Sequence, residues 1–167
     1  MARPFDPIAI FAVLAEHEVE YVLVGGMAGV IRGSTAMTND ADIVPAPTTA
    51  NLDRLSRALT DLEARLRTAD DPAGIAFDPH PVLLRSVATL NMTTRHGDVD
   101  LTFTPAALDD YEALHGAGDV YEIEGHRVRV ASLDDIIRSK QAAGRPKDLA
   151  TLPILLALRD EIERGRA

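Results

Sequence analysis

The chain has 167 residues, of which 17 are Lys or Arg and 26 are Asp or Glu, so its formal charge is −9. This length fits one ordinary domain, and the lack of cysteine excludes disulfides, thiolate metal sites and cysteine nucleophiles. The acidity argues against a protein that coats nucleic acid, although residues 1–125 hold 8 basic and 20 acidic residues whereas 126–167 hold 9 and 6.

The first half of the chain predicts helices and strands in mixture. Apolar spacing predicts a helix over 6–18, and short apolar, β-branched runs predict strands over 21–24 and 41–44. A short helix over 27–32 is expected between these strands, and leucines at every third or fourth position predict an amphipathic helix over 48–67. The Pro, Gly and Asp residues of 68–82 are typical of a loop.

The second half adds strands over 86–94 and 98–103, a helix over 105–115 and a hairpin of 120–124 with 126–130. Two helices follow, over 132–143 and 147–164, the second interrupted near Pro153. Because the strands do not alternate strictly with the helices, we predict an α+β fold, a mixed β-sheet flanked by helices with a C-terminal helical segment. We expect a core over 1–131 and a helical extension over 132–167 packed on it, as one domain.

No stretch approaches the roughly 20 apolar residues needed to span a membrane, and the start lacks the features of a signal peptide. We therefore expect a cytoplasmic protein without a membrane partner. The five histidines show no metal-ligand spacing.

Carboxylates recur at i and i+2 on two predicted strands. Asp40 and Asp42 point to one face, about 6.5–7 Å apart along the strand. Two like charges held together favour a bound cation, and carboxylate oxygens suit Mg²⁺, although a solvated strand end has the same pattern. Asp98 and Asp100 repeat the spacing. If the two strands are neighbours, Asp100, or else Asp98, completes a two-metal site for phosphoryl displacement.

Phosphate-binding candidates surround these acids in the sequence. Gly25 and Gly26 stand at a strand-to-helix turn, where backbone N–H groups can approach a phosphate, although a tight turn alone also explains them. Lys140 is one of only two lysines and falls on the apolar stripe of its helix, so it either extends to solvent or, as we favour, reaches a buried anion. Ser34 is a further candidate contact to phosphate.

Three strings resemble a known group. The string VGGMAGVIRGSTAMTNDADIV resembles the strand–GG–helix–strand signature of the DNA polymerase β-type nucleotidyltransferase superfamily, with Ala36 where these proteins usually have Arg. HGDVDLTF resembles the segment of the third carboxylate. SLDDIIRSKQAAGRPKDLATLPIL resembles the following helical segment, with Lys140, Arg145, Lys147 and Asp148 in the familiar places. The nearest members are small GG-type proteins, including abortive-infection-type toxins and aminoglycoside and lincosamide nucleotidyltransferases.

The resemblance implies a polymerase β-like palm and an Mg²⁺-dependent enzyme that moves a nucleoside monophosphate from an NTP to an acceptor hydroxyl. By the same resemblance, the acceptor is RNA (notably tRNA), a protein or a small molecule, and the chain is the toxin of a toxin–antitoxin pair with a cognate antitoxin partner, or else an antibiotic-modifying enzyme. The implied catalytic residues are Asp40, Asp42, Asp100 and Lys140, with the three aspartates as metal ligands, and the implied nucleotide-binding residues are Gly25, Gly26, Ser34, Thr38 and Lys147.

Two other interpretations remain open. Ala36 in place of Arg is compatible with a catalytically degenerate member that acts as a binding or antitoxin subunit. A dinucleotide-binding βα unit at VLVGGMAG fits less well, because its spacing is GGxxG rather than GxGxxG.

Overall fold

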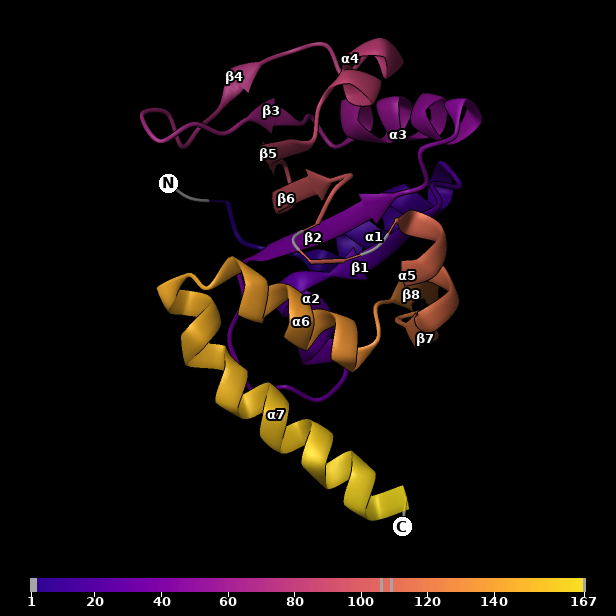
Figure 1. The fold of residues 1–167 in the computed structure, drawn as a ribbon. Helices are drawn as coiled ribbons and strands as arrows, with labels where there is room; N and C mark the ends of the chain where they lie inside the picture. The colour runs from indigo at the N-terminus through magenta and orange to yellow at the C-terminus, as the bar shows by residue number, and fades with distance from the viewer. Residues whose placement is uncertain (1–2, 106, 109, 167) are drawn as a thin grey trace.

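The computed structural model describes residues 3–105, 107–108 and 110–166, and within them seven helices and eight strands (Figure 1). The helices are α1 (Pro7–Glu16), α2 (Gly25–Ile31), α3 (Thr49–Asp61), α4 (Pro81–Ser86), α5 (Tyr111–Ala117), α6 (Leu133–Ala143) and α7 (Pro146–Arg166). The strands are β1 (Tyr21–Val24), β2 (Asp40–Pro45), β3 (Arg65–Leu66), β4 (Ile75–Ala76), β5 (Thr89–Thr94), β6 (Gly97–Thr102), β7 (Asp119–Ile123) and β8 (His126–Val130).

All eight strands join one mixed sheet in the order β4-β3-β5-β6-β2-β1-β8-β7. The central strand β2 pairs antiparallel with β1 and parallel with β6, so the two strands that carry aspartate pairs are direct neighbours. β5 and β6 form one antiparallel hairpin inside the sheet, and β7 and β8 form another at one edge. This arrangement confirms the predicted α+β fold with a mixed sheet.

The alternation of side chains along β2 separates the core from the site. Ala41 and Ile43 are fully buried in the hydrophobic core, whereas Asp40 and Asp42, on the other face, are half-buried. Helices α1 and α3 pack against each other, while α6 packs on α2 and on α7. The C-terminal α7 extends past the rest of the molecule (Figure 1). The strand face with the aspartates is therefore left open toward α6 and the start of α7.

The predicted helix over 48–67 is too long by six residues at its end. Helix α3 ends at Asp61, and Glu63 then adopts a φ of 53°, a left-handed conformation that a helix cannot continue through. Leu66, which continues the leucine spacing, pairs instead with Met92 of β5. The leucine spacing of α3 therefore continues into the strand β3, because both elements place leucine against the core.

The predicted loop over 68–82 and strand over 86–94 also need correction. Helix α4 occupies their junction, with Pro81 at its first turn and the His80 side chain accepting a hydrogen bond from the Val82 N–H at 3.1 Å. The two-residue strand β4 lies inside the predicted loop. The prediction missed α4 because a helix of six residues is too short to show a periodicity.

Two helices near the C-terminus differ from their predicted bounds. The helix expected over 105–115 is α5, which begins at Tyr111 after the Asp110 cap, while residues 106 and 109 of the expected span lie outside the described part. Helix α7 runs through Pro153 without the expected interruption. Proline removes the hydrogen bond to the Leu149 carbonyl, and Leu149 is exposed, so water can reach that carbonyl.

Among the residues described, no helix is both long and apolar enough to cross a membrane. The division at residue 131 into a core and an extension stays a prediction.

Candidate active site

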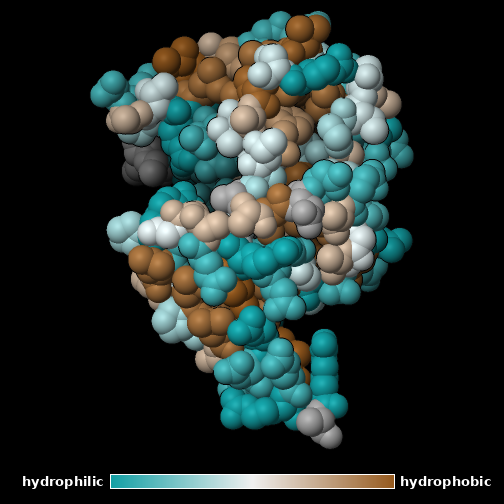
Figure 2. All heavy atoms as spheres, in the orientation of Figure 1, coloured by the Kyte–Doolittle hydropathy of each residue, from teal (hydrophilic) through white to brown (hydrophobic). Residues whose placement is uncertain are grey.

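One pocket of about 680 Å³ gathers all nine side chains and glycines predicted for the site. Figure 2 shows this face of the molecule hollowed between the part that holds β3 and β4 and the part that holds α6 and α7. The nine lining positions are Gly25, Gly26, Ser34, Thr38, Asp40, Asp42, Asp100, Lys140 and Lys147. The structure thus brings the predicted residues together, and their roles in catalysis and binding stay predictions.

The acidic side of the pocket, defined as Asp40, Asp42 and Asp100, is built by the register of two parallel strands. Asp42 of β2 stands opposite Asp100 of β6, and Asp40 stands opposite Asp98. One carboxylate oxygen from each of Asp40, Asp42 and Asp100 lies within 4.8 Å of the others. Among the described residues, only these three acids form such a group, so Asp100 rather than Asp98 is the third carboxylate of the cluster.

Burial and neighbouring charges raise the pKa values of Asp42 and Asp100 on the acidic side. Burial, the neighbouring Asp40 and the neighbouring Asp100 raise the pKa of Asp42 to about 7. Burial also raises the pKa of Asp100, and the Arg67 guanidinium opposes this shift. Carboxylates crowded in this way are stabilised by a bound cation, and three carboxylate oxygens are a donor set that suits Mg²⁺. The residues present therefore fit a divalent metal.

Two glycines form the floor of the pocket because nothing larger fits there. Gly25 has a φ of +69°, and a Cβ at this position would overlap the carboxylate of Asp42. A Cβ at Gly26 would lie 2.9 Å from Oγ1 of Thr38. Thr38 in turn donates a hydrogen bond to the Asp40 carboxylate at 3.0 Å. The glycine pair is thus required by the close packing of the acidic side, independently of any phosphate.

The basic side of the pocket, defined as Lys140, Arg145 and Lys147, comes from α6 and the start of α7. Asp148 is buried and ties two of these cations together, with Lys140 Nζ at 3.4 Å from Oδ1 and Arg145 Nε at 2.7 Å from Oδ2. Burial opposes ionisation of Asp148, but the hydrogen bonds and charge of Arg145 and Lys140 outweigh it and lower its pKa.

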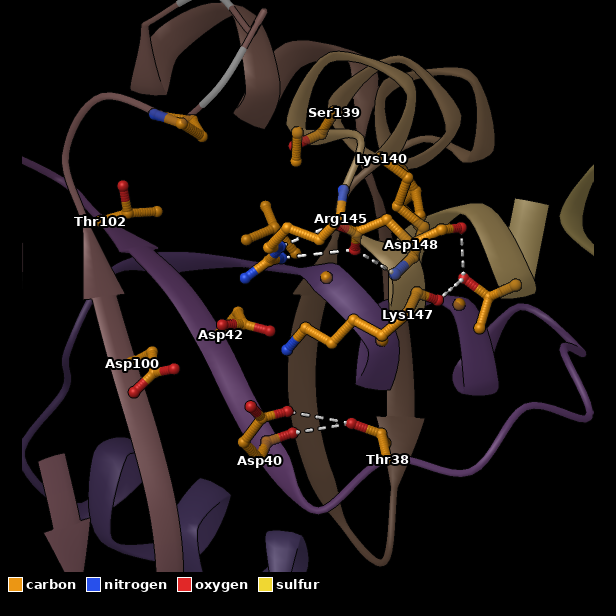
Figure 3. Close-up of a pocket in the computed structure, with 18 of the residues that line it drawn as sticks. Thr38, Asp40, Asp42, Asp100, Thr102, Ser139, Lys140, Arg145, Lys147 and Asp148 are labelled. Carbon is orange, nitrogen blue, oxygen red and sulfur yellow. Dashed lines mark hydrogen bonds and ion pairs between the residues drawn. The ribbon is translucent and has the colours of Figure 1, made fainter. Parts of the chain in front are cut away.

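Lys147 is the third cation of the basic side and has a different environment. Within the part of the chain that the structure describes, Lys147 Nζ makes no ion pair within 4.0 Å. Figure 3 shows its side chain extending toward Asp40 and Asp42, with Arg145 also pointing into the space between the two sides. The charge of Lys147 partly offsets the rise in the pKa of Asp42. The pocket therefore places a cation-attracting surface opposite an anion-attracting one.

The loop that joins α2 to β2 closes another part of the pocket. Ser34 accepts a hydrogen bond from the Ala36 N–H at 3.2 Å, so its hydroxyl has a structural role in this loop. Ala36 itself lines the pocket, at the position where the resemblance leads one to expect Arg. A small side chain at this place leaves the mouth of the pocket without a further cation from this loop.

Sequence reasoning missed Arg67, which donates hydrogen bonds to both Asp98 and Asp100. No motif marks this residue, and the predicted helix over 48–67 would have placed it on a helix end rather than beside a sheet. Its position follows from the pairing of β3 with β5, which only the tertiary structure shows.

Comparison with known proteins places the fold in a recognisable group. No family model matches the sequence, and no curated protein does. Among solved structures, the lincomycin-bound lincosamide antibiotic adenylyltransferase LnuA aligns with a TM-score of 0.60 at 12% identity, covering 91% of this chain and 95% of that one. The antibiotic-resistance factor ANT(2'')-Ia aligns with a TM-score of 0.56 at 18% identity, covering 96% and 90%.

A third similar structure is an antigenic nucleotidyltransferase-like protein from Paracoccidioides brasiliensis, with a TM-score of 0.51 at 18% identity, covering 93% of this chain and 77% of that one. The chain has the polymerase β-like fold of these nucleotidyltransferases. At such identities the likeness establishes the fold, and the chemistry must be argued from the site itself.

Proposed function

We propose that the protein is an Mg²⁺-dependent nucleotidyltransferase that moves a nucleoside monophosphate from an NTP to an acceptor hydroxyl and releases pyrophosphate. The observation that carries this proposal is the pairing of a three-carboxylate cluster with a basic surface across one pocket. A nucleoside triphosphate with its divalent cation offers the complementary pair of charges. The similarity of the fold to nucleotidyltransferases supports the same reaction class.

Asp40, Asp42 and Asp100 would hold the metal, which when bound would supply charge stabilisation to the reacting phosphoryl oxygens. Thr38 fixes the Asp40 carboxylate through its hydrogen bond. Lys147, Lys140 and Arg145 would balance the charge of the triphosphate and stabilise the departing pyrophosphate. The backbone N–H groups at Gly25 and Gly26 would contact its phosphates, since these glycines line the pocket and present no side chain of their own.

In the transfer step, the acceptor hydroxyl oxygen forms a bond to the α-phosphorus while the bond from that phosphorus to the bridging oxygen breaks. Asp100 would assist removal of the hydroxyl proton, because a carboxylate oxygen that is not engaged by the metal can accept it. Pyrophosphate leaves toward the basic side. The atoms balance without a further reactant.

We propose a small, hydroxylated and positively charged molecule as the acceptor. ANT(2'')-Ia and LnuA, whose structures contain adenylyl-2''-tobramycin and lincomycin respectively, are matched over most of both chains, and the acidic side of the pocket attracts a cation. An RNA acceptor with a toxin role is the second candidate, because the sequence resemblance includes abortive-infection-type toxins and both lysines lie in the mildly basic segment 126–167.

The test is incubation of the protein and Mg²⁺ with each labelled NTP and, in parallel, an aminocyclitol, a lincosamide or total tRNA, followed by identification of the labelled product. Label on a small molecule supports the first acceptor, and label on tRNA selects the second. Asp40→Ala and Asp42→Ala are expected to abolish transfer while the circular dichroism spectrum is retained.

Asp134→Ala is the matched control, because this aspartate of α6 is 76% exposed and lies outside the pocket. Full activity of the Asp40→Ala and Asp42→Ala double variant would refute the proposed function. Failure of the wild-type protein to bind Mg-ATP, Mg-CTP or Mg-GTP in calorimetry would instead support a degenerate binding subunit.

A further inference from the structure

Arg67 is the one cation, within the described chain, that is ion-paired with the carboxylate cluster. Its Nη2 lies 2.9 Å from Oδ1 and 3.2 Å from Oδ2 of Asp100, so one guanidinium nitrogen contacts both oxygens of that carboxylate. Its Nη1 donates to Asp98. Arg67 is thus shared between the third carboxylate of the cluster and an acid that stands outside the cluster.

The sheet fixes Arg67 in this position. Its backbone N–H donates to the Asn91 carbonyl at 2.9 Å, and Asn91 of β5 stands opposite Asp100 of β6 in the register. The side chain therefore crosses one strand to reach β6. A planar guanidinium held at its backbone can engage two carboxylates at once with fixed geometry, which a lysine ammonium cannot reproduce.

The surroundings of Arg67 leave it room to move. The side chain is 29% exposed and lines a second cavity of about 970 Å³, next to the active-site pocket. Asp98 lines this second cavity too, whereas Asp100 lines the first, and Asn39 lines both. The guanidinium can therefore withdraw from Asp100 into open space without leaving Asp98.

We propose that Arg67 is an internal counter-cation and positioning residue for Asp100, which bridges Asp98 and Asp100 in the metal-free protein and remains on Asp98 alone when Asp100 ligates a divalent cation. The inference rests on the proposed function, since it assigns Asp100 to a metal. In this scheme Arg67 keeps its ion pair with Asp98 after the metal has bound. Arg67 competes with the metal for Asp100, and it also sets the orientation of the Asp100 carboxylate toward the metal.

The decisive property of this scheme is that metal binding and turnover move in opposite directions. Arg67→Met removes the competing charge, so the affinity for Mn²⁺, used as a spectroscopic substitute for Mg²⁺, is expected to rise roughly 3- to 10-fold. The same change frees the Asp100 carboxylate to rotate, so kcat for nucleotide transfer is expected to fall about 10- to 100-fold. A purely structural residue would weaken both.

The experiment measures Mn²⁺ binding to the full chain by electron paramagnetic resonance, without nucleotide, for Arg67→Met, Asp98→Asn and the double variant. Asp98→Asn leaves Arg67 with Asp100 as its only carboxylate, so Mn²⁺ affinity is expected to fall roughly 3- to 10-fold. In the Arg67→Met background the same Asp98→Asn change is expected to have much less effect, because the two residues are coupled. Additive effects in the double variant would overturn the proposal.

Arg65→Met is the matched control, since Arg65 lies two residues earlier and donates to the Ala73 and Gly74 carbonyls rather than to an acid. It is expected to leave Mn²⁺ affinity unchanged. Should Arg67→Met fail to fold by circular dichroism, Arg67→Lys replaces it, with retained Mn²⁺ affinity and reduced kcat expected. Unchanged or weaker Mn²⁺ binding by folded Arg67→Met would overturn the inference. Wild-type protein that binds Mn²⁺ but transfers no nucleotide would refute only the proposed function.

Discussion

The acidic and basic sides of the pocket differ in how their charges are paired. On the basic side, cations gather around a buried acid, and Asp148 is bound by both Lys140 and Arg145 at its carboxylate oxygens. On the acidic side, three carboxylates converge and the pKa of Asp42 rises to about 7 because of burial and its two neighbours. Among the described residues, two of the three cations of the basic side are ion-paired with a buried acid, whereas on the acidic side Asp100 alone is ion-paired, with Arg67.

This difference shows which side depends on a ligand. Lys140 of α6 and Arg145 in the turn before α7 need no ligand to compensate their charges, since both are ion-paired with Asp148. Within the described part of the chain, Arg67 is the one cation ion-paired with the strand side, and it contacts one of the three carboxylates. We therefore expect metal removal to destabilise the strand side and leave the helix side unchanged.

The largest effect is expected on turnover from the acidic side. Asp100→Asn keeps the shape of the side chain but removes its charge and its ability to accept a proton, so transfer is expected to fall about 1,000-fold. Initial rates at saturating NTP measure this. Asp134→Asn, on the exposed surface of α6, is the control and should retain the rate. Equal rates for Asp100→Asn and wild type would show that the acidic side is dispensable for transfer.

The next effect is the pH dependence of metal-free stability. Asp42 has a pKa of about 7 in the folded chain against an ordinary value of 3.8, so the folded state holds a proton that the unfolded state has released between these pH values. The free energy of unfolding is therefore expected to fall as pH rises from about 4 to 7. Asp42→Asn is expected to remove this loss and to be more stable at pH 8 by on the order of 2–4 kcal/mol.

Urea unfolding in the presence of a chelator, repeated across that pH range, measures the slope. Asp134→Asn is again the matched control and should keep the wild-type slope. The same pH slope for wild type and Asp42→Asn would show that Asp42 is compensated after all.

A smaller effect is expected at the floor of the acidic side. Gly25→Ala introduces a Cβ that overlaps the Asp42 carboxylate, at a φ that alanine rarely adopts, so a loss of roughly 1–3 kcal/mol is expected. Thermal or urea unfolding measures it. Gly116→Ala provides the contrast, because a Cβ there meets no atom within 4 Å. If both variants were equally stable, the Asp42 carboxylate would be able to move away from a Cβ at position 25.

The smallest effect is expected on the basic side. Lys147→Met removes one cation that lies near Asp42, so NTP affinity in calorimetry is expected to weaken about 10-fold, with folding unaffected. Arg164→Met, at the far end of α7, should bind NTP as the wild type does. Tighter NTP binding by Lys147→Met would show that the basic side does not meet the triphosphate.

Pattern reasoning succeeded where the chemistry repeats along the chain. The i, i+2 spacing of Asp40 with Asp42 and of Asp98 with Asp100 follows the pleat of a strand, so both pairs could be placed on one face before their pairing was known. The position of Lys140 on the apolar face of its helix predicted that its side chain points toward the core. The structure places it in the pocket beside Asp148.

It failed where a contact joins elements without a local pattern. Arg67 reaches Asp100 only because β3 lies beside β5, and β3 itself is two residues long and continues the leucine spacing of α3. The choice between Asp98 and Asp100 needed the register of β6 on β2, which a sequence cannot fix by spacing alone.

The parallel pairing of β2 with β6 has a consequence for how the site forms. Two adjacent parallel strands cannot be joined by a tight turn, and residues 46–96 intervene between these two. The three carboxylates therefore meet only after a long loop closure, a slow and entropically costly event in folding. A divalent cation that needs all three has no high-affinity site in partly folded chains, so its binding is a direct marker of the completed sheet.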